Sequence, residues 1–555
     1  MLFRAISKQV RFGLLKKNVY SQCKCLVRCV NLTSFRAVHH SSYSNPKLLN
    51  VRKASAITAS VATVGILTYL FGEAFEDGIP VSEIKLHNKV DDCWIVLNGE
   101  VYDVTAFLKQ HPGGAARILE VAGQDATDKF HEMHSDAILD KVKGKLIYIG
   151  KMKGQFYKEL TAEEMRIMDM KSKLPPLSSV FSISDFEAIA KQVLPKSSFM
   201  YFATGASDEF TLRENHYAYS RVFFRPKILQ DTNTDVDTST NFLGAKVNIP
   251  IYITAFAGSK LADPIGEMHL QAASYDANVM HMVPKQNSYS VDDFFDVVPE
   301  DQNHWMQFHF DTEEEKRNVD QFLRTAESLP SVKGVFFNVD LPDIGNREKD
   351  SRQRASTDGY HGLDEMTPNQ FGQHPRLAWK DIEKIISSTS LPVALKGVQR
   401  GEDVVLAAEK GIKAVVLSNH GGRQLDFSRP PLEVLVEAKQ MLREKNLEDK
   451  IEIYVDGGIR RGSDVVKALC LGATGVGLGR PFLYAMAGYG EDGVAKLIDI
   501  LETEIKNNMR LLGVDKIEDL NESFVDARNL KLRNPRIADS LYDEAYQPLT
   551  FPEFR

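Results

Sequence analysis

The chain has 555 residues, enough for two or three domains, and its 43% hydrophobic and 26% charged residues are typical of a globular protein. Its net charge of −7 is unevenly distributed, because residues 1–72 contain eleven Lys or Arg and no Asp or Glu. Without that segment 57 basic residues stand against 75 acidic ones, a net −18, which argues against nucleic-acid binding and favours a basic partner.

The basic segment predicts a targeting sequence. Residues 1 to about 45 combine Arg, Lys and Ser without acids, the composition of a mitochondrial transit peptide. The 19 uncharged residues at 54–72 are just enough to span a bilayer as a helix. We interpret residues 1–72 as a presequence with a hydrophobic sorting segment, cleaved near residues 72–77, which predicts delivery to the mitochondrial intermembrane space. A permanent membrane anchor is the alternative that hydrophobicity leaves open.

Cysteine usage argues against a disulfide framework. Three of the five cysteines lie in the basic segment, and only Cys93 and Cys470 remain in the body of the chain. These two are far apart in sequence and outside any metal-ligand spacing.

Residues 79–150 predict a small α+β domain that holds haem. Strand-like runs flank an Asn-Gly turn at 98–99, and the motif HPGG begins at His111. Two more histidines follow, His131 and His134. Two imidazoles that reach an iron from opposite sides leave no open position for oxygen and favour electron transfer. The glycines after His111 let the backbone pass close to a flat macrocycle.

This segment resembles the cytochrome b5 family. The resemblance rests on Trp94, the run YDVT at 102–105, the HPGG turn and a second histidine 23 residues after His111. It implies a haem b with His111 and His134 as axial ligands. His131 is interpreted as a neighbour on the same helix.

Residues 151–178 are polar and charged and end in Pro175-Pro176, which predicts a hinge linker between two domains. Residues 179–540 are expected to form the second domain, and residues 541–555 a C-terminal tail.

Eight apolar, strand-like runs alternate with helical stretches in the second domain. They are IPIYITAFA, NVMHMVP, HWMQFHF, KGVFFNVD, LPVALKGV, KAVVLSNHGG, IEIYVDGG and TGVGLGRP. Eight β/α units of this length predict a parallel (β/α)8 TIM barrel, whose functional site lies at the carboxyl ends of the strands.

Polar side chains gather at those ends. In chain order they are Ser288, Gln307, His309, Asn338, Asp340, Lys396, His420 and Asp456. The last two runs end in DGGIRRG and GLGRP, where barrels commonly bind phosphate, because glycines allow close backbone approach and arginine pairs with phosphate. These candidates are Gly457, Gly458, Arg460, Gly479 and Arg480. No GxGxxG fingerprint appears, so FMN is favoured over FAD or NAD.

The segment LSNHGGRQLDFSRP at 417–430 resembles the family of FMN-dependent L-2-hydroxy-acid oxidases and dehydrogenases. YFATGASDEFTLREN upstream and YVDGGIRRGSDVVKALCLGATGVGLGRPFLY downstream extend the match across the barrel. With the haem domain in front, the resemblance implies a dehydrogenase that oxidises L-lactate or a related small L-2-hydroxy acid on FMN. It would pass the electrons to haem and then to cytochrome c. A homotetramer is a further expectation from the family.

The reaction needs a base and a carboxylate clamp. His420 is the candidate base, since the ordinary pKa of imidazole lies near working pH. Asp340 would orient the His420 ring and stabilise its cation. Arg423, three residues after the base, would hold the substrate carboxylate. By resemblance, Tyr201 is a second carboxylate partner and Arg347 supports the site.

The remaining flavin positions are implied by the resemblance. Lys396 would lie near the N1–C2 edge of the flavin, where a cation stabilises the charge of the reduced ring. Further contacts are expected from Ala257, Ser288, Gln307 and Asn338.

Three positions depart from the family's usual pattern. His309 stands where a tyrosine is usual, Asn338 where a threonine is usual, and the segment around Ser288 differs. A histidine at position 309 can hydrogen-bond the substrate hydroxyl, but its charge changes near neutral pH. This predicts turnover slower than the family norm, with additional pH dependence below about 7. The alternative is that His309 points away from the site and packs.

Other functions stay open at this stage. The substrate could be a larger 2-hydroxy acid such as mandelate. The chain could also be a haem–flavin electron-transfer protein with weak turnover, although His420 and Arg423 are both present. An oxidase that uses oxygen is the third alternative, and the haem domain argues against it.

Overall fold

The computed structural model describes residues 78–533 except 112–114, 128, 131–138, 140–141, 157–159, 231–234, 358–374 and 376. The predicted presequence, the C-terminal tail and the candidate haem histidines His131 and His134 lie outside the described residues. The chain divides into two compact units, Met1–Lys158 and Glu159–Arg555.

The first unit is built on a five-stranded sheet of order β1-β5-β4-β3-β2. Its strands are β1 (Ile79–Pro80), β2 (Asn88–Lys89), β3 (Asp92–Leu97), β4 (Glu100–Asp103) and β5 (Ile147–Lys153), and its helices include α3 (Val81–Ile84), η1 (Leu108–Gln110) and α4 (Ala115–Leu119). The predicted turn between β3 and β4 is present, with left-handed backbone at Asn98 and Gly99, as a two-residue hairpin requires.

The stretch predicted as a linker contains ordered elements. Strand β5 extends to Lys153, and helix α7 spans Ala162–Ser172 behind a capping box of Thr161 and Glu164. Arg166 on α7 donates to the carbonyl of Leu194 at 2.9 Å, so this helix is fixed to the second unit. The polar composition that suggested a hinge belongs to a surface helix.

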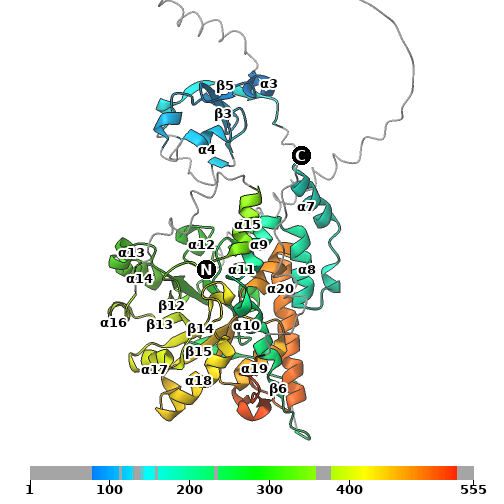
Figure 1. The fold of residues 1–555 in the computed structure, drawn as a ribbon, viewed down its shortest axis with the longest axis vertical. Coiled ribbons are helices and arrows are strands. Elements are labelled where there is room, and N and C mark those ends of the chain that lie inside the picture. Colours follow the sequence, from blue (N-terminus) through cyan, green and yellow to red (C-terminus); the bar gives the residue numbers. More distant parts are fainter. Residues whose placement is uncertain are drawn as a thin grey trace, which may run out of the picture. The chain divides into compact units, whose positions relative to one another are not determined.

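The second unit contains a closed barrel of eight parallel strands, in the order β9 to β16, as predicted (Figure 1). The strands are β9 (Ile251–Ile253), β10 (Met280–Val283), β11 (His304–Phe308), β12 (Val332–Asn338), β13 (Val393–Val398), β14 (Ala414–Leu417), β15 (Glu452–Asp456) and β16 (Gly475–Leu478). Each coincides with one of the eight apolar runs, because strands covered by helices are buried on both faces.

Helices surround the barrel and precede it. Ahead of β9 come α8 (Ile183–Val193), α9 (Lys196–Ala203) and α10 (Phe210–Ser220). Between and after the strands lie α11 (Glu267–Asp276), α12 (Val291–Phe295), α13 (Glu313–Arg317), α14 (Val319–Glu327), α15 (Glu348–Thr357), α16 (Trp379–Ser387), α17 (Gly401–Glu409), α18 (Pro431–Glu444), α19 (Gly462–Cys470) and α20 (Arg480–Leu512). Within the described ranges, no helix is both long and apolar enough to cross a bilayer.

A hairpin of β7 (Thr240–Phe242) and β8 (Ala245–Val247) closes the amino-terminal end of the barrel. Phe242 is fully buried there, with its ring 5.7 Å from Trp305 and 5.1 Å from Tyr454. A Cβ on Gly475 would lie 2.3 Å from the Phe242 ring, so β16 must begin with glycine. The opposite end of the barrel is left for the functional site.

Two histidines lie buried between the barrel wall and α12. His281 and His304 are about 1% and 0% exposed, with ring centroids 5.7 Å apart. Neither ring nitrogen of His304 has a hydrogen-bond partner among the residues that the structure describes. Burial lowers the pKa of His281 to about 3 and places that of His304 well below its ordinary value. Both rings are therefore neutral in the folded protein.

This burial predicts acid sensitivity. In the unfolded chain both rings take up protons below about pH 6.5, so stability present above that pH is lost as pH falls, by about 2 kcal/mol per histidine at pH 5. We expect the unfolding temperature, followed by flavin fluorescence, to fall between pH 8 and pH 5 and to fall less in His281→Leu/His304→Leu. An equally steep fall in that variant would contradict this assignment.

Candidate active site

A cavity of about 830 Å³ lies at the carboxyl ends of the barrel strands. All but two of the site residues predicted in the barrel line it, namely Tyr201, Ala257, Gln307, His309, Asn338, Arg347, Lys396, His420, Arg423, Asp456, Gly457, Gly458, Arg460, Gly479 and Arg480. The two exceptions are Asp340, which lies behind His420, and Ser288.

The His420 ring faces Asp340. The distance from His420 Nδ1 to Asp340 Oδ2 is 3.3 Å, and the Asp340 side chain is 2% exposed against 26% for His420. Since Nδ1 faces the carboxylate, Nε2 is the nitrogen that can accept a proton. The two residues come from the ends of β14 and β12, which the barrel brings to one rim.

The electrostatic surroundings keep His420 neutral and Asp340 ionised. Burial lowers the pKa of His420 below its ordinary value, and Lys396 and Arg347 lower it further, while Asp340 opposes them. Burial alone would raise the pKa of Asp340, but its interaction with His420, which includes a hydrogen bond, and the charge of Lys396 outweigh burial, and the pKa is lowered. A neutral imidazole beside a carboxylate is the state a general base requires.

Two half-buried arginines, Arg423 and Arg480, line the cavity, and among the described residues neither forms an ion pair with a carboxylate. Arg423 donates to the carbonyls of Tyr201 at 2.6 Å and Thr204 at 2.8 Å, and Arg480 donates to those of Phe202 and Thr204. Burial, followed by repulsion from Arg347 and Arg480, lowers the pKa of Arg423 to about 9. Positive charge so crowded and desolvated is a site for anions.

Tyr201 and Arg460 flank this cluster. The Arg423 guanidinium lies 5.2 Å from the centroid of the Tyr201 ring, which brings the two predicted carboxylate partners together. Arg460 lies 3.5 Å from Glu187, so this predicted phosphate ligand already has an acidic neighbour.

The candidate flavin positions surround a buried ion pair. Lys396 Nζ lies 3.3 Å from Asp456 Oδ2, with both side chains 6% exposed or less. Asn338 Oδ1 and Asp456 Oδ1 are buried acceptors without a hydrogen-bond partner in the described part of the chain. A ligand that carries N–H or O–H donors would satisfy them, and the isoalloxazine and ribityl groups of FMN carry such donors. The residues present therefore fit FMN.

The glycines after β15 line the cavity, and Gly458 also has a packing reason, while their phosphate role stays a prediction. Gly457 and Gly458 have φ of +99° and +82°. A Cβ on Gly458 would lie 2.1 Å from the carbonyl oxygen of Asn215 on α10. Gly458 therefore permits the close approach of this loop to α10, and the backbone remains open toward the cavity.

Ser288 was predicted to contact the flavin, but the structure places it outside the cavity lining. Its backbone N–H and its hydroxyl lie 3.2 and 3.1 Å from Oε1 of Glu267, a fully buried carboxylate at the start of α11. The buried carboxylate needs these donors, so Ser288 does not line the cavity. Gln286, two residues earlier, does.

His309 lines the cavity but is held from both sides. Its Nε2 lies 3.1 Å from Asp311 and its Nδ1 lies 3.5 Å from the amide of Gln307. Asp311 is bound in turn by Lys285 at 2.6 Å. His309 lowers the pKa of Asp311 by this hydrogen bond. The ring is thus part of a polar network on the cavity wall, and its reach toward a substrate stays a prediction.

Sequence reasoning missed two residues that hold the base in place. Gln424 donates to the carbonyls of Asp340 at 2.8 Å and Asp343 at 2.7 Å, joining the loops after β12 and β14. Gly397 has φ of +103°, and a Cβ there would lie 2.4 Å from Asp340 Cγ. Two sequence signals could have identified these residues. Gln424 directly follows the predicted carboxylate clamp Arg423, and Gly397 directly follows the predicted flavin contact Lys396.

In the first unit, His111 follows η1 and is half-buried, with its ring 5.9 Å from that of Phe107. The apolar side chains of Phe107, Leu108 and Ile118 belong to the core beside it. An imidazole on an apolar wall fits an axial haem ligand. The second predicted ligand, His134, lies outside the described residues.

Comparison with known proteins agrees with both units. Residues 190–527 match the family model described as FMN-dependent dehydrogenase, and residues 80–153 match the cytochrome b5-like haem/steroid binding domain.

Two relatives are L-lactate dehydrogenases (cytochrome). The protein from Wickerhamomyces anomalus is 46% identical over 485 residues, which cover 85% of this chain and 84% of that protein. The protein from Saccharomyces cerevisiae is 42% identical over 536 residues, which cover 90% of each.

Solved structures give the same result. A mutant of flavocytochrome b2 with pyruvate bound is 44% identical, with a TM-score of 0.64, over 72% of this chain and 99% of that one. The flavin-binding domain of baker's yeast flavocytochrome b2 is 45% identical with the same TM-score, over 71% of this chain and 99% of that one. Mandelate oxidase is more distant, at 32% identity and a TM-score of 0.57 over 63% of this chain and 98% of that one. The chain therefore belongs to the FMN-dependent dehydrogenase family and carries a cytochrome b5-like haem domain ahead of its barrel.

Proposed function

We propose that this chain oxidises L-lactate, or a closely related small L-2-hydroxy acid, to the 2-keto acid and delivers the electrons through FMN and haem b to cytochrome c. The observation that supports this proposal is the His420–Asp340 pair in one cavity with Arg423 and Arg480, which form no ion pair with a carboxylate of the described residues. The L-lactate specificity is supported by the relatives that bear that activity in their names.

The residues of the cavity account for the proton and the charge. Arg423 binds the substrate carboxylate, which relieves the repulsion among the crowded guanidinium groups. His420 accepts the substrate proton at Nε2, and Asp340 stabilises the imidazolium that results. Lys396 offers its positive charge to the cofactor site from the end of β13.

FMN, when bound, accepts the two electrons of the alcohol oxidation and can release them singly to a haem. Its ring system would be held by the side chains of Lys396, Asn338, Gln307 and Asp456. Gly479 and Arg480 lie at the end of β16, where barrels bind phosphate. Burial, together with the charges of Asp340, Lys396 and Arg347, sets the proton affinity of His420.

We further infer a mitochondrial intermembrane-space protein that assembles as a homotetramer. The acid-free basic composition of residues 1 to about 45 and the uncharged run 54–72 that follows support the location. The tetramer rests on the family resemblance alone. Sizing of the purified protein with light scattering would distinguish it from a monomer or dimer.

Anaerobic mixing with L-lactate is the test of this function. We expect flavin bleaching to precede haem reduction, because the barrel holds the base and the substrate site. In His111→Ala or His134→Ala the haem spectrum should be lost while flavin reduction survives. A panel with L-mandelate and glycolate measures specificity, and faster flavin reduction by L-mandelate than by L-lactate would replace the proposed substrate.

The base assignment predicts a pH profile. Because the pKa of His420 is lowered, the rate of flavin reduction should stay level down to about pH 6.5 and fall only below it. In Asp340→Asn the amide can donate to Nδ1 and move the ring proton to Nε2, so the rate should fall on the order of 100-fold or more.

The matched control for this variant is Asp263→Asn, which breaks another His–Asp pair, with His269 at 2.9 Å, outside the cavity lining. We expect its rate and pH profile to equal those of the unmodified protein. If Asp340→Asn behaved like this control, His420 would not depend on Asp340.

The charge of the mature chain predicts how it meets its acceptor. With a net −18 after residue 72, the second-order rate of cytochrome c reduction should fall as salt is added, because screening shortens to about 8 Å near physiological ionic strength. Stopped-flow measurements across a salt series test this expectation. A rate independent of ionic strength would remove electrostatic attraction from the encounter.

A further inference from the structure

The loop that carries His420 has an unfavourable backbone. Three consecutive residues are left-handed, with φ of +59° at His420, +63° at Gly421 and +77° at Gly422. This conformation costs about 1 kcal/mol for a residue with a Cβ, and the two glycines add flexibility. The loop therefore needs support from outside to hold the imidazole toward Asp340.

That support is a reciprocal pair of buried amides. Asn419, the residue before His420, donates from Nδ2 to Asn215 Oδ1 at 2.7 Å, and Asn215 Nδ2 donates back to Asn419 Oδ1 at 2.7 Å. The two side chains are 0% and 1% exposed. Asn419 Oδ1 also accepts the backbone N–H of Gly422 at 3.0 Å. The Asn419 side chain therefore hydrogen-bonds across the left-handed turn of residues 420–422.

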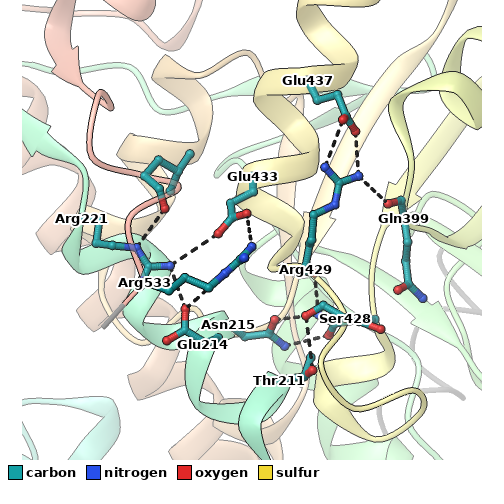
Figure 2. Close-up of polar contacts among 12 residues, drawn as sticks. Thr211, Glu214, Asn215, Arg221, Gln399, Ser428, Arg429, Glu433, Glu437 and Arg533 are labelled. Carbon is teal, nitrogen blue, oxygen red and sulfur yellow. Dashed lines mark hydrogen bonds and ion pairs between the residues drawn. The ribbon is translucent and has the colours of Figure 1, made fainter. Parts of the chain in front are cut away.

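The two residues to which Asn419 Nδ2 donates, Asn215 and Arg429, lie in segments held by ion pairs. Its Nδ2 also donates to the carbonyl of Arg429 at 3.1 Å, and Arg429 forms a two-pronged pair with Glu437 on α18. On α10, Glu214 precedes Asn215 and pairs with Arg221 at 2.9 Å. Figure 2 shows the Arg429–Glu437 pair and the Glu214–Arg221 pair on either side of Asn215.

A second network links α10 to the C-terminal segment. Arg533 pairs with Glu433 on α18 and lies 4.0 Å from Glu214. Arg221 donates to the carbonyl of Leu530 at 2.9 Å and lies 3.6 Å from Glu433 (Figure 2). The start of α10 is fixed independently, since Asp426 accepts the N–H of Thr211 at 2.8 Å.

Asn215 also touches the loop after β15. A Cβ on Gly457 would lie 3.2 Å from Asn215 Nδ2, and one on Gly458 would lie 2.1 Å from the Asn215 carbonyl oxygen. Because these glycines stand at the candidate phosphate end of the cavity, Asn215 sets the spacing between the base loop and the cofactor loop.

We infer that Asn215 and Asn419 are positioning residues that fix the His420 imidazole for proton abstraction. This inference rests on the proposed function of His420 as base. The side chains of the amide pair lie outside the cavity lining. Its effect on the reaction passes through the backbone of residues 419–422.

The experiment compares FMN-loaded full-length variants in anaerobic mixing with L-lactate. Asn215→Ala removes two hydrogen bonds from the buried Asn419 amide, so we expect flavin reduction to slow about 10- to 100-fold, as for a misplaced catalytic group. Water admitted to the ring should also move the acid limb of the pH profile upward, toward about pH 6.5. Asn215→Ala/Asn419→Ala should be no slower than the slower single variant, because the two amides act as one unit.

A second buried amide pair supplies the control. Gln271 donates to Gln302 at 2.7 Å, with both side chains at least 96% buried and outside the cavity lining. Gln302→Ala should lower the unfolding temperature as Asn215→Ala does, yet leave the flavin-reduction rate and its pH profile unchanged. A purely structural role for Asn215 would make the two variants alike, and that result would overturn the inference.

The outcomes also separate this inference from the proposed function. If the unmodified protein failed to reduce its flavin with L-lactate, or His420→Gln reduced it at full rate, the proposed function would fail. If His420→Gln is slow but Asn215→Ala is as fast as the unmodified protein, only the positioning role fails. Should Asn215→Ala not load FMN, Asn215→Ser is measured in the same way and decides by the same criteria.

Discussion

The site depends on one contact, that between the His420 imidazole and the Asp340 carboxylate. A carboxylate that is 2% exposed is tolerated only where opposite charge and hydrogen bonds compensate for the lost water. Lys396 supplies the opposite charge and His420 a hydrogen bond. The space is supplied by Gly397, which could carry no Cβ without striking Asp340. The ends of β12, β13 and β14 are thus adapted to a single ionised group.

The barrel and most of its site could be predicted from the sequence, for a physical reason. Parallel strands buried on both faces appear as uninterrupted apolar runs, and the polar residue that ends each run must lie on one rim. This reasoning identified the candidate site residues His420, Asp340, Lys396 and Asp456. The two cofactors were predicted from the HPGG turn and from the glycines that follow β15. The family matches confirm FMN and haem.

The features that could not be predicted from the sequence depend mainly on contacts between segments that are far apart in the chain. Ser288 was placed at the flavin from its position after a strand, but the buried carboxylate of Glu267 holds it elsewhere. Helix α7 was hidden because its exposed face is as polar as a linker. The bonds from Gln424 and the network around His309 join segments far apart in the chain, and only tertiary packing sets such distances.

The arginines of the cavity share an acceptor, the carbonyl of Thr204, which receives Arg423 at 2.8 Å and Arg480 at 3.1 Å. An anion that draws one guanidinium away leaves that carbonyl to the other and removes part of their mutual repulsion. Under the roles proposed for these arginines, the affinity for a carboxylate at Arg423 and that for a phosphate at Arg480 are coupled. By thermodynamic reciprocity, each ligand would change the affinity of the other by the same factor, so the substrate concentration would set how strongly the cofactor is retained.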